Sequence, residues 1–152
     1  IDDLFELPAL YRTAREALEL MMDRRFHSGN VCTVAQLRTP LLLKDLEGRS
    51  DLIAKELRAL AAHDKKKNTQ YCETLYHYLT CCRSLKKTCD ALFTHRNTVL
   101  YRIRRIEDDF AIPLDDPAAH ADLLLGVSLL LFKERGPDFF LHTINKNEKE
   151  GQ

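Results

Sequence analysis

The sequence predicts a mainly α-helical protein, a helical bundle with a C-terminal helix-turn-helix. The chain of 152 residues holds only five Gly and five Pro and has no Trp, a composition that favours helices over a β-sandwich or barrel. Apolar residues also recur at helical spacing along most of the chain. We expect at most one short strand, near residues 31–35 (VCTVA), because it would have no partner strand within this chain.

The first part of the chain is predicted to consist of helices. Apolar residues at positions 7, 10, 14, 18 and 21 indicate a long amphipathic helix over Leu7–Phe26. Pro8 suits its first turn, and Ser28–Asn30 is predicted to end it. A short apolar helix is expected over Pro40–Leu46. Because the sequence starts with Ile rather than Met, we expect a C-terminal fragment of a longer protein.

A run of three lysines marks the domain boundary that we expect. Ser50 is the predicted cap of a helix over Asp51–His63. We interpret the following segment, Asp64–Asn68, as a linker whose lysines lie just past the helix end, where cations favour the helix dipole. The alternative is a basic tail that grips phosphate. The linker interpretation divides the chain into residues 1–67, the tail of an upstream domain plus linker, and a second domain at residues 68–152.

The second domain begins and ends with predicted helices. The first is expected to run from a cap at Asn68 or Thr69 to about Thr80. Near the other end, Asp115–Pro117 is a helix start signal, with Asp at the cap and Pro at the first helical position. The helix over Pro117–Arg135 is apolar on nearly every side, which is typical of a central helix or one shared with a partner. We therefore expect a homodimer. A Gly-Pro pair ends this helix, and residues 138–145 are expected to form one more short helix.

Between them, two short helices joined by a tight turn are predicted over Leu85–Phe93 and Arg96–Asp108. Each has one apolar face, and the two faces can pack together across a turn of a few residues, which is the spacing of a helix-turn-helix. The faces consist of Leu85, Cys89 and Leu92 in the first helix and of Val99, Ile103 and Ile106 in the second.

Positive charge is concentrated on this pair of helices. Seven of the 23 Lys and Arg residues, but only one of the 23 Asp and Glu residues, lie between Arg83 and Arg105. Such a footprint is typical of a nucleic-acid binder, although a solvated helical hairpin can also carry it. The polar side chains of the segment suit phosphates and base edges. The candidate DNA-binding residues are Ser84, Lys86, Lys87, His95, Arg96, Asn97, Thr98, Tyr101, Arg102, Arg104 and Arg105.

The second helix is the predicted recognition helix, because recognition helices place their N-terminal residues against base edges. Arg96 and Asn97 lie at its start and can make bidentate bonds to guanine and adenine. Alternatively, Asn97 and Thr98 merely satisfy first-turn amides. We expect Tyr101 to pack on a sugar or a thymine methyl. Phosphate contacts are expected from His95 and Thr98 near the helix start and from Lys86, Lys87, Arg104 and Arg105.

The string ALF-x-HRNT-x-x-YR-(I/L)-x-RIE, found here at Ala91–Glu107, resembles the C-terminal helix-turn-helix of PucR/CdaR-type bacterial transcription regulators. Cys89 and Thr94 stand where that family usually has Ala and Val, but both are small. A weaker likeness continues through residues 112–130, IPLDDPAAHADLLLGVSLL. The resemblance implies sequence-specific binding of double-stranded operator or promoter DNA, with Arg96–Asp108 in the major groove. It also implies transcription regulation and an effector that binds regions outside this fragment. The cysteines, most of them on or beside apolar helix faces, favour a reducing cytoplasm.

Other classes of function find less support. A protein-interaction or dimerisation module whose basic helix meets an acidic partner is the main alternative. RNA binding commonly uses a GXXG loop or a sheet with exposed aromatic residues, and the sequence shows neither. No convergent catalytic constellation is apparent, so we expect neither an enzyme nor a cofactor. No apolar run approaches membrane-spanning length, so no membrane contact is expected. The five cysteines form no C-x-x-C pair, and we expect no metal site, because no standard zinc spacing occurs among Cys72, His77, Cys81, Cys82 and His95.

Overall fold

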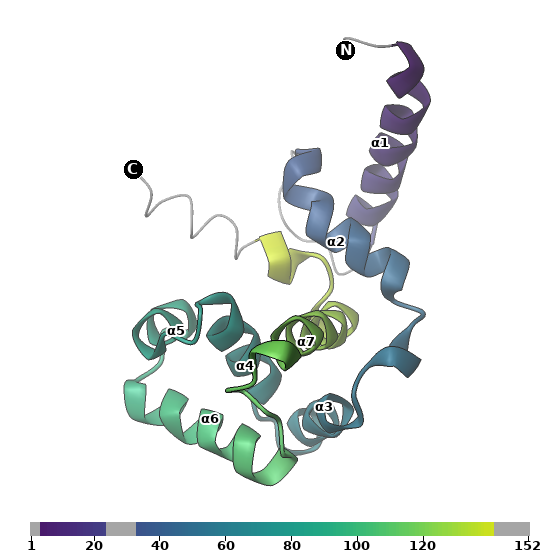
Figure 1. Cartoon of the computed structure of the whole chain (residues 1–152). Coiled ribbons are helices and arrows are strands. Elements are labelled where there is room, and N and C mark those ends of the chain that lie inside the picture. Colours follow the sequence, from purple (N-terminus) through teal and green to yellow (C-terminus); the bar gives the residue numbers. More distant parts are fainter. Residues whose placement is uncertain (1–3, 24–32, 142–152) are drawn as a thin grey trace. The chain divides into compact units, whose positions relative to one another are not determined.

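The computed structural model describes residues 4–23 and 33–141, and within these ranges helices are joined by turns and irregular segments, with no strand. Figure 1 shows the succession of helices along the chain. The chain forms two compact units, one made of Ile1–Gly48 and Phe132–Gln152 and the other of Arg49–Leu131. The predicted mainly α fold is therefore confirmed. The predicted boundary near residue 67 remains a prediction.

The first unit contains η1 (Leu4–Glu6), α1 (Leu7–Met21) and α2 (Val34–Leu46). Helix α1 has Pro in its first turn, as predicted, and buries Ala17 and Leu20. Helices α1 and α2 pack together. Helix α1 ends at Met21, five residues before the predicted end at Phe26. The predicted stop signal, Ser28–Asn30, lies outside the described residues.

The one short strand that the sequence allowed near residues 31–35 does not form in the part that the structure describes. Thr33 caps α2 instead, because its hydroxyl accepts from the N–H of Gln36 at 3.3 Å while its own N–H donates to Gln36 Oε1 at 2.9 Å. This reciprocal capping box starts the helix at Val34. The predicted start at Pro40 was six residues late, since Pro40 lies buried inside α2.

The second unit contains η2 (Ser50–Leu52), α3 (Lys55–Lys67), α4 (Tyr71–Thr80), α5 (Leu85–Leu92), α6 (Arg96–Phe110), η3 (Pro117–Ala119) and α7 (His120–Arg135) as far as Leu131. The prediction that Ser50 caps a helix beginning at residue 51 is wrong. Ser50 starts the single turn η2, and α3 begins after Ala54, which makes no side-chain capping bond.

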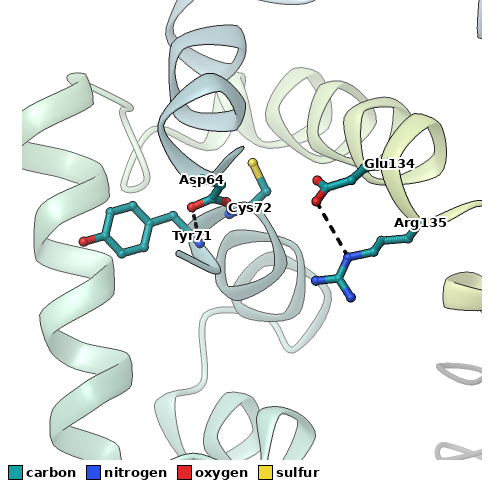
Figure 2. A network of polar contacts seen from close by, with 5 residues as sticks. All are labelled: Asp64, Tyr71, Cys72, Glu134 and Arg135. Carbon is teal, nitrogen blue, oxygen red and sulfur yellow. Dashed lines mark hydrogen bonds and ion pairs between the residues drawn. The ribbon is translucent and has the colours of Figure 1, made fainter. Parts of the chain in front are cut away.

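The lysine run lies inside α3 rather than past its end, so Asp64–Asn68 is not an irregular linker. Asn68 adopts a left-handed conformation with φ 53° and ends α3. Neither Asn68 nor Thr69 caps α4. Figure 2 shows what caps it: the carboxylate of Asp64 accepts from the backbone N–H groups of Tyr71 at 2.9 Å and Cys72 at 2.8 Å. The buried Asp64 therefore satisfies two first-turn donors of α4 from the last turns of α3.

The core of the second unit forms around α6, which packs against α3, α4 and α5. Val99, Ile103 and Ile106 are at most 5% exposed, which confirms the predicted apolar face of the second helix. Leu57 and Leu60 of α3 and Leu75 and Leu79 of α4 are equally buried. In α7, a Cβ at Gly126 would come within 2.6 Å of Leu57 Cδ1, so the missing side chain allows α7 to approach α3 closely.

The helix start signal predicted at Asp115–Pro117 is present after α6, with one difference. Asp116 accepts from the N–H of Ala118 at 2.9 Å, but the residues it caps form the short η3, and α7 itself begins at His120. Helix α7 ends before Gly136, which has φ 76° as the Gly-Pro break requires. Residues 138–141 are helical, and the remainder of the predicted last helix lies outside the described residues.

Candidate nucleic-acid interface

A short turn joins α5 to α6 and is fixed by local hydrogen bonds. Ser84 caps α5, where its hydroxyl accepts from the N–H of Lys87 at 3.4 Å. Helix α5 ends at Leu92, one residue before the predicted end, because Phe93 is left-handed with φ 50°. The N–H of Thr94 then donates to the carbonyl of Cys89 at 3.1 Å. The predicted pair of helices and its turn are confirmed.

The buried residue of α5 is not one of the three that were expected. Leu85, Cys89 and Leu92 are only half-buried, whereas Thr88 is fully buried. The Thr88 hydroxyl donates to the carbonyl of Ser84 at 2.7 Å, which removes the cost of burying a polar group. Sequence periodicity missed Thr88 because it counted apolar types alone.

The N-terminal turn of α6 is exposed. His95 occupies the cap position but makes no side-chain capping bond, so its ring is not committed to the first-turn amides. The hydroxyl of Thr94, the residue before it, donates to the carbonyl of Leu92 at 3.0 Å. The exposed residues of α6 and its cap that the sequence predicted as DNA contacts are His95, Arg96, Asn97, Thr98, Tyr101, Arg104 and Arg105.

Two arginines of α6 are held by the protein itself. Arg102 is half-buried, and its Nη1 donates to Thr74 Oγ1 in α4 at 3.2 Å. Arg105 Nη2 forms an ion pair with Asp109 Oδ2 at 2.7 Å. A side-chain hydrogen bond with Tyr71, together with Asp109, raises the pKa of Arg105. Of the residues that the sequence predicted on this helix, Arg102 therefore stands apart, because its guanidinium is directed to α4 rather than to solvent.

On α5, the two lysines that the sequence predicted as DNA contacts, Lys86 and Lys87, are exposed. Lys86 and Arg96 line one surface hollow of about 410 Å³, to which Leu85, Cys89 and Asp90 also contribute. The structure thus brings basic side chains of both helices to the rim of a shared depression. Ser84 is engaged as the cap of α5.

Acidic groups lie near the C-terminal end of α6 and in the segment that follows it. Burial raises the pKa of Glu107, and the nearby carboxylates of Asp115 and Asp108 raise it further. The pKa of Tyr78 is raised by burial, then by the charges of Glu107 and Asp115. Arg83 Nη1 donates to the carbonyl of Leu114 at 3.0 Å, so this arginine ties the segment after α6 to the end of α4.

The remaining expectations concern metal binding, the cysteines and the membrane. Within residues 4–23 and 33–141, no cluster of three or more His, Cys, Asp or Glu could hold a metal ion. In the same ranges Cys72 is buried, Cys81 and Cys89 are half-buried and Cys82 is exposed. Burial raises the pKa of the Cys81 thiol. No helix in the described part of the chain is long and apolar enough to cross a membrane.

Comparison with known proteins identifies this pair of helices. Residues 71–129 match the model of the PucR C-terminal helix-turn-helix domain. The chain is 31% identical over 128 residues to the proline-responsive transcriptional activator PutR of Bacillus subtilis (strain 168). That alignment covers 80% of this chain but only 31% of the relative. No solved structure matches the chain significantly. Residues 71–129 therefore form a helix-turn-helix domain of the PucR C-terminal type.

Proposed function

We propose that the chain binds double-stranded DNA sequence-specifically, with the N-terminal turn of α6 in the major groove. The observation that carries the proposal is the exposed set His95, Arg96 and Asn97 at the start of a helix whose opposite face is buried. A rigid helix holds these side chains in place, and Arg and Asn are suited to bidentate bonds with guanine and adenine. The family to which residues 71–129 belong supports DNA as the partner.

The remaining candidates would divide into phosphate contacts and positioning residues. Lys86, Lys87 and Arg104 are exposed and basic, so we assign them to phosphates. Arg105 shares its charge with Asp109, which weakens its attraction to phosphate. Arg102 acts as a positioning residue, because its guanidinium is directed to Thr74.

The chain would form part of a larger regulator in the cytoplasm, without catalytic activity or a cofactor. PutR is described as responsive to proline, and the chain spans about a third of that protein's length. We propose that an effector binds outside residues 1–152. We also propose a homodimer, since helix-turn-helix proteins commonly occupy paired half-sites about one turn of DNA apart. Sedimentation over a concentration series tests the dimer, and a monomer at the highest concentrations would contradict it.

The alternative is a module in which the basic face of α5 and α6 meets an acidic protein. A mobility-shift titration against duplexes selected from a random pool decides between the two, with a random duplex as control. DNA binding predicts tighter binding to the selected duplex and a steep loss of affinity for both as salt rises. No shift of either duplex at low salt would refute the proposal and leave the interaction module.

A further inference from the structure

Phe93, in the turn between α5 and α6, combines an unfavourable backbone conformation with an exposed ring. Its backbone is left-handed, with φ 50°, a conformation that is unfavourable for residues other than Gly, Asn and Asp. Its side chain is 83% exposed, so the ring gains little from burial in the fold. Asn68 holds the equivalent position at the end of α3 and is a residue type suited to it. An exposed phenylalanine is therefore an unusual choice for this turn.

The backbone around Phe93 is nevertheless held by hydrogen bonds. Its N–H donates to the carbonyl of Asp90 at 3.4 Å, and the next residue, Thr94, is bonded through its N–H to Cys89 at 3.1 Å and through its hydroxyl to Leu92 at 3.0 Å. The ring is carried on a turn that these bonds hold in place. It lies one residue before the Thr94–His95 entry into α6, beside the exposed first turn of that helix.

We propose that Phe93 contacts DNA through its ring, which packs on apolar surface of the duplex next to the recognition helix. The inference rests on the proposed function. Deoxyribose carbons and the thymine methyl group are the apolar parts of DNA that a protein can reach, and an aromatic ring suits both. The neighbouring side chains Arg96 and Asn97 are polar, so Phe93 provides the apolar contact that they lack. An exposed ring in an unfavourable backbone conformation is explained if the DNA covers it.

The test compares Phe93→Asn with the wild-type chain on a duplex that the wild type has selected from a random pool. Asparagine tolerates the left-handed backbone, so we expect the melting temperature to rise by about 2–4 °C. Affinity for the selected duplex should nevertheless fall about five- to tenfold, because the apolar contact is lost. The slope of log affinity against log salt should stay unchanged, since no phosphate contact is removed.

Two variants control the measurement. Phe93→Tyr keeps the ring and should bind within about twofold of the wild type. Leu52→Asn removes another exposed apolar side chain, 64% exposed in η2 and outside the helix-turn-helix, and should leave the affinity for DNA unchanged. An equal loss in Leu52→Asn and Phe93→Asn would overturn the inference, because the effect would then not be local to the turn.

The outcomes separate this inference from the proposed function. If the wild type binds no duplex, both the proposed function and the inference on Phe93 are refuted. If the wild type and Phe93→Asn bind the selected duplex with equal affinity, Phe93 makes no contact and only the inference falls. A salt slope reduced by about one in Phe93→Asn would also overturn it, because the turn would then be holding a phosphate contact instead.

Discussion

Arg102 of α6 donates from Nη1 to the buried hydroxyl of Thr74 in α4, at 3.2 Å. Thr74 also donates to the carbonyl of Gln70 at 2.7 Å, so its hydroxyl is both donor and acceptor. The bond ties α6 to α4, the helix on which it packs. Arg102 and Arg104 are two residues apart in sequence, yet only Arg104 is exposed. The two arginines should therefore respond differently to substitution.

We expect Arg102→Ala to lower the free energy of unfolding by about 1–2 kcal/mol, because it removes a charge-assisted hydrogen bond and leaves Thr74 without its donor. Arg104→Ala should leave stability within about 0.5 kcal/mol of the wild type, as is usual for exposed positions. For DNA, Arg104→Ala should reduce the salt slope by about one, and Arg102→Ala should leave it unchanged. Urea titration and binding over a salt series measure both. If Arg102→Ala reduced the salt slope and Arg104→Ala did not, Arg102 would be the phosphate contact.

The carboxylate of Asp64 accepts from two backbone N–H groups at the start of α4, and Thr69 donates to it as well. Asp64→Ala should cost about 2–4 kcal/mol of stability, because buried donors lose their acceptor. Asp51→Ala is the matched control, since it removes only an exposed pair with Arg49 at 3.4 Å and should cost less than about 1 kcal/mol. Similar urea midpoints for the two variants would mean that Asp64 does not stabilise α4.

Glu107 provides a prediction with a pH dependence. Because its pKa in the folded chain is raised above the ordinary 4.5, the folded state binds this proton more tightly than the unfolded chain does. Ionised Glu107 therefore destabilises the fold, and stability falls as pH rises from about 4.5 through the raised pKa. Glu107→Gln should raise the melting temperature at pH 7 by about 1–3 °C, and this gain should vanish below about pH 4.

Removing a carboxylate that stabilises the fold should have the opposite effect on the melting temperature. Asp122 lies in the first turn of α7, where a negative charge favours the helix dipole. Asp122→Asn should therefore lower the melting temperature at pH 7. Thermal melts of both variants at several pH values check the pair. A lower melting temperature for Glu107→Gln at neutral pH would show that its carboxylate makes a favourable contact.

The sequence predicted the helix-turn-helix because its signals are local. Val99, Ile103 and Ile106 recur at helical spacing, and all three are buried. A local signal also argues against the strand that was considered near residues 31–35. Thr33 and Gln36 form the S/T-x-x-E/Q pattern of a capping box, which outweighs the β propensity of the neighbouring Val residues.

Other features depend on contacts between helices and could not be predicted from spacing. Asp64 looked like part of a solvated linker, and only the packing of α3 against α4 directs its carboxylate to Tyr71 and Cys72. Arg102 and Arg105 lie on the flanks of the predicted recognition face, but Thr74 and Asp109 hold them. Helical periodicity gives the direction of a side chain and says nothing of its partner on another helix.

Asn97→Ala tests the central claim, that the start of α6 recognises bases, most directly. Asn97 is exposed, so the substitution should change the melting temperature little. Affinity for the selected duplex should fall by about 1–3 kcal/mol while affinity for random duplex is retained, so that the ratio of the two falls and preference relaxes at one or two base pairs. A lower melting temperature with an unchanged ratio would contradict the account, because Asn97 would then serve only the first turn of the helix.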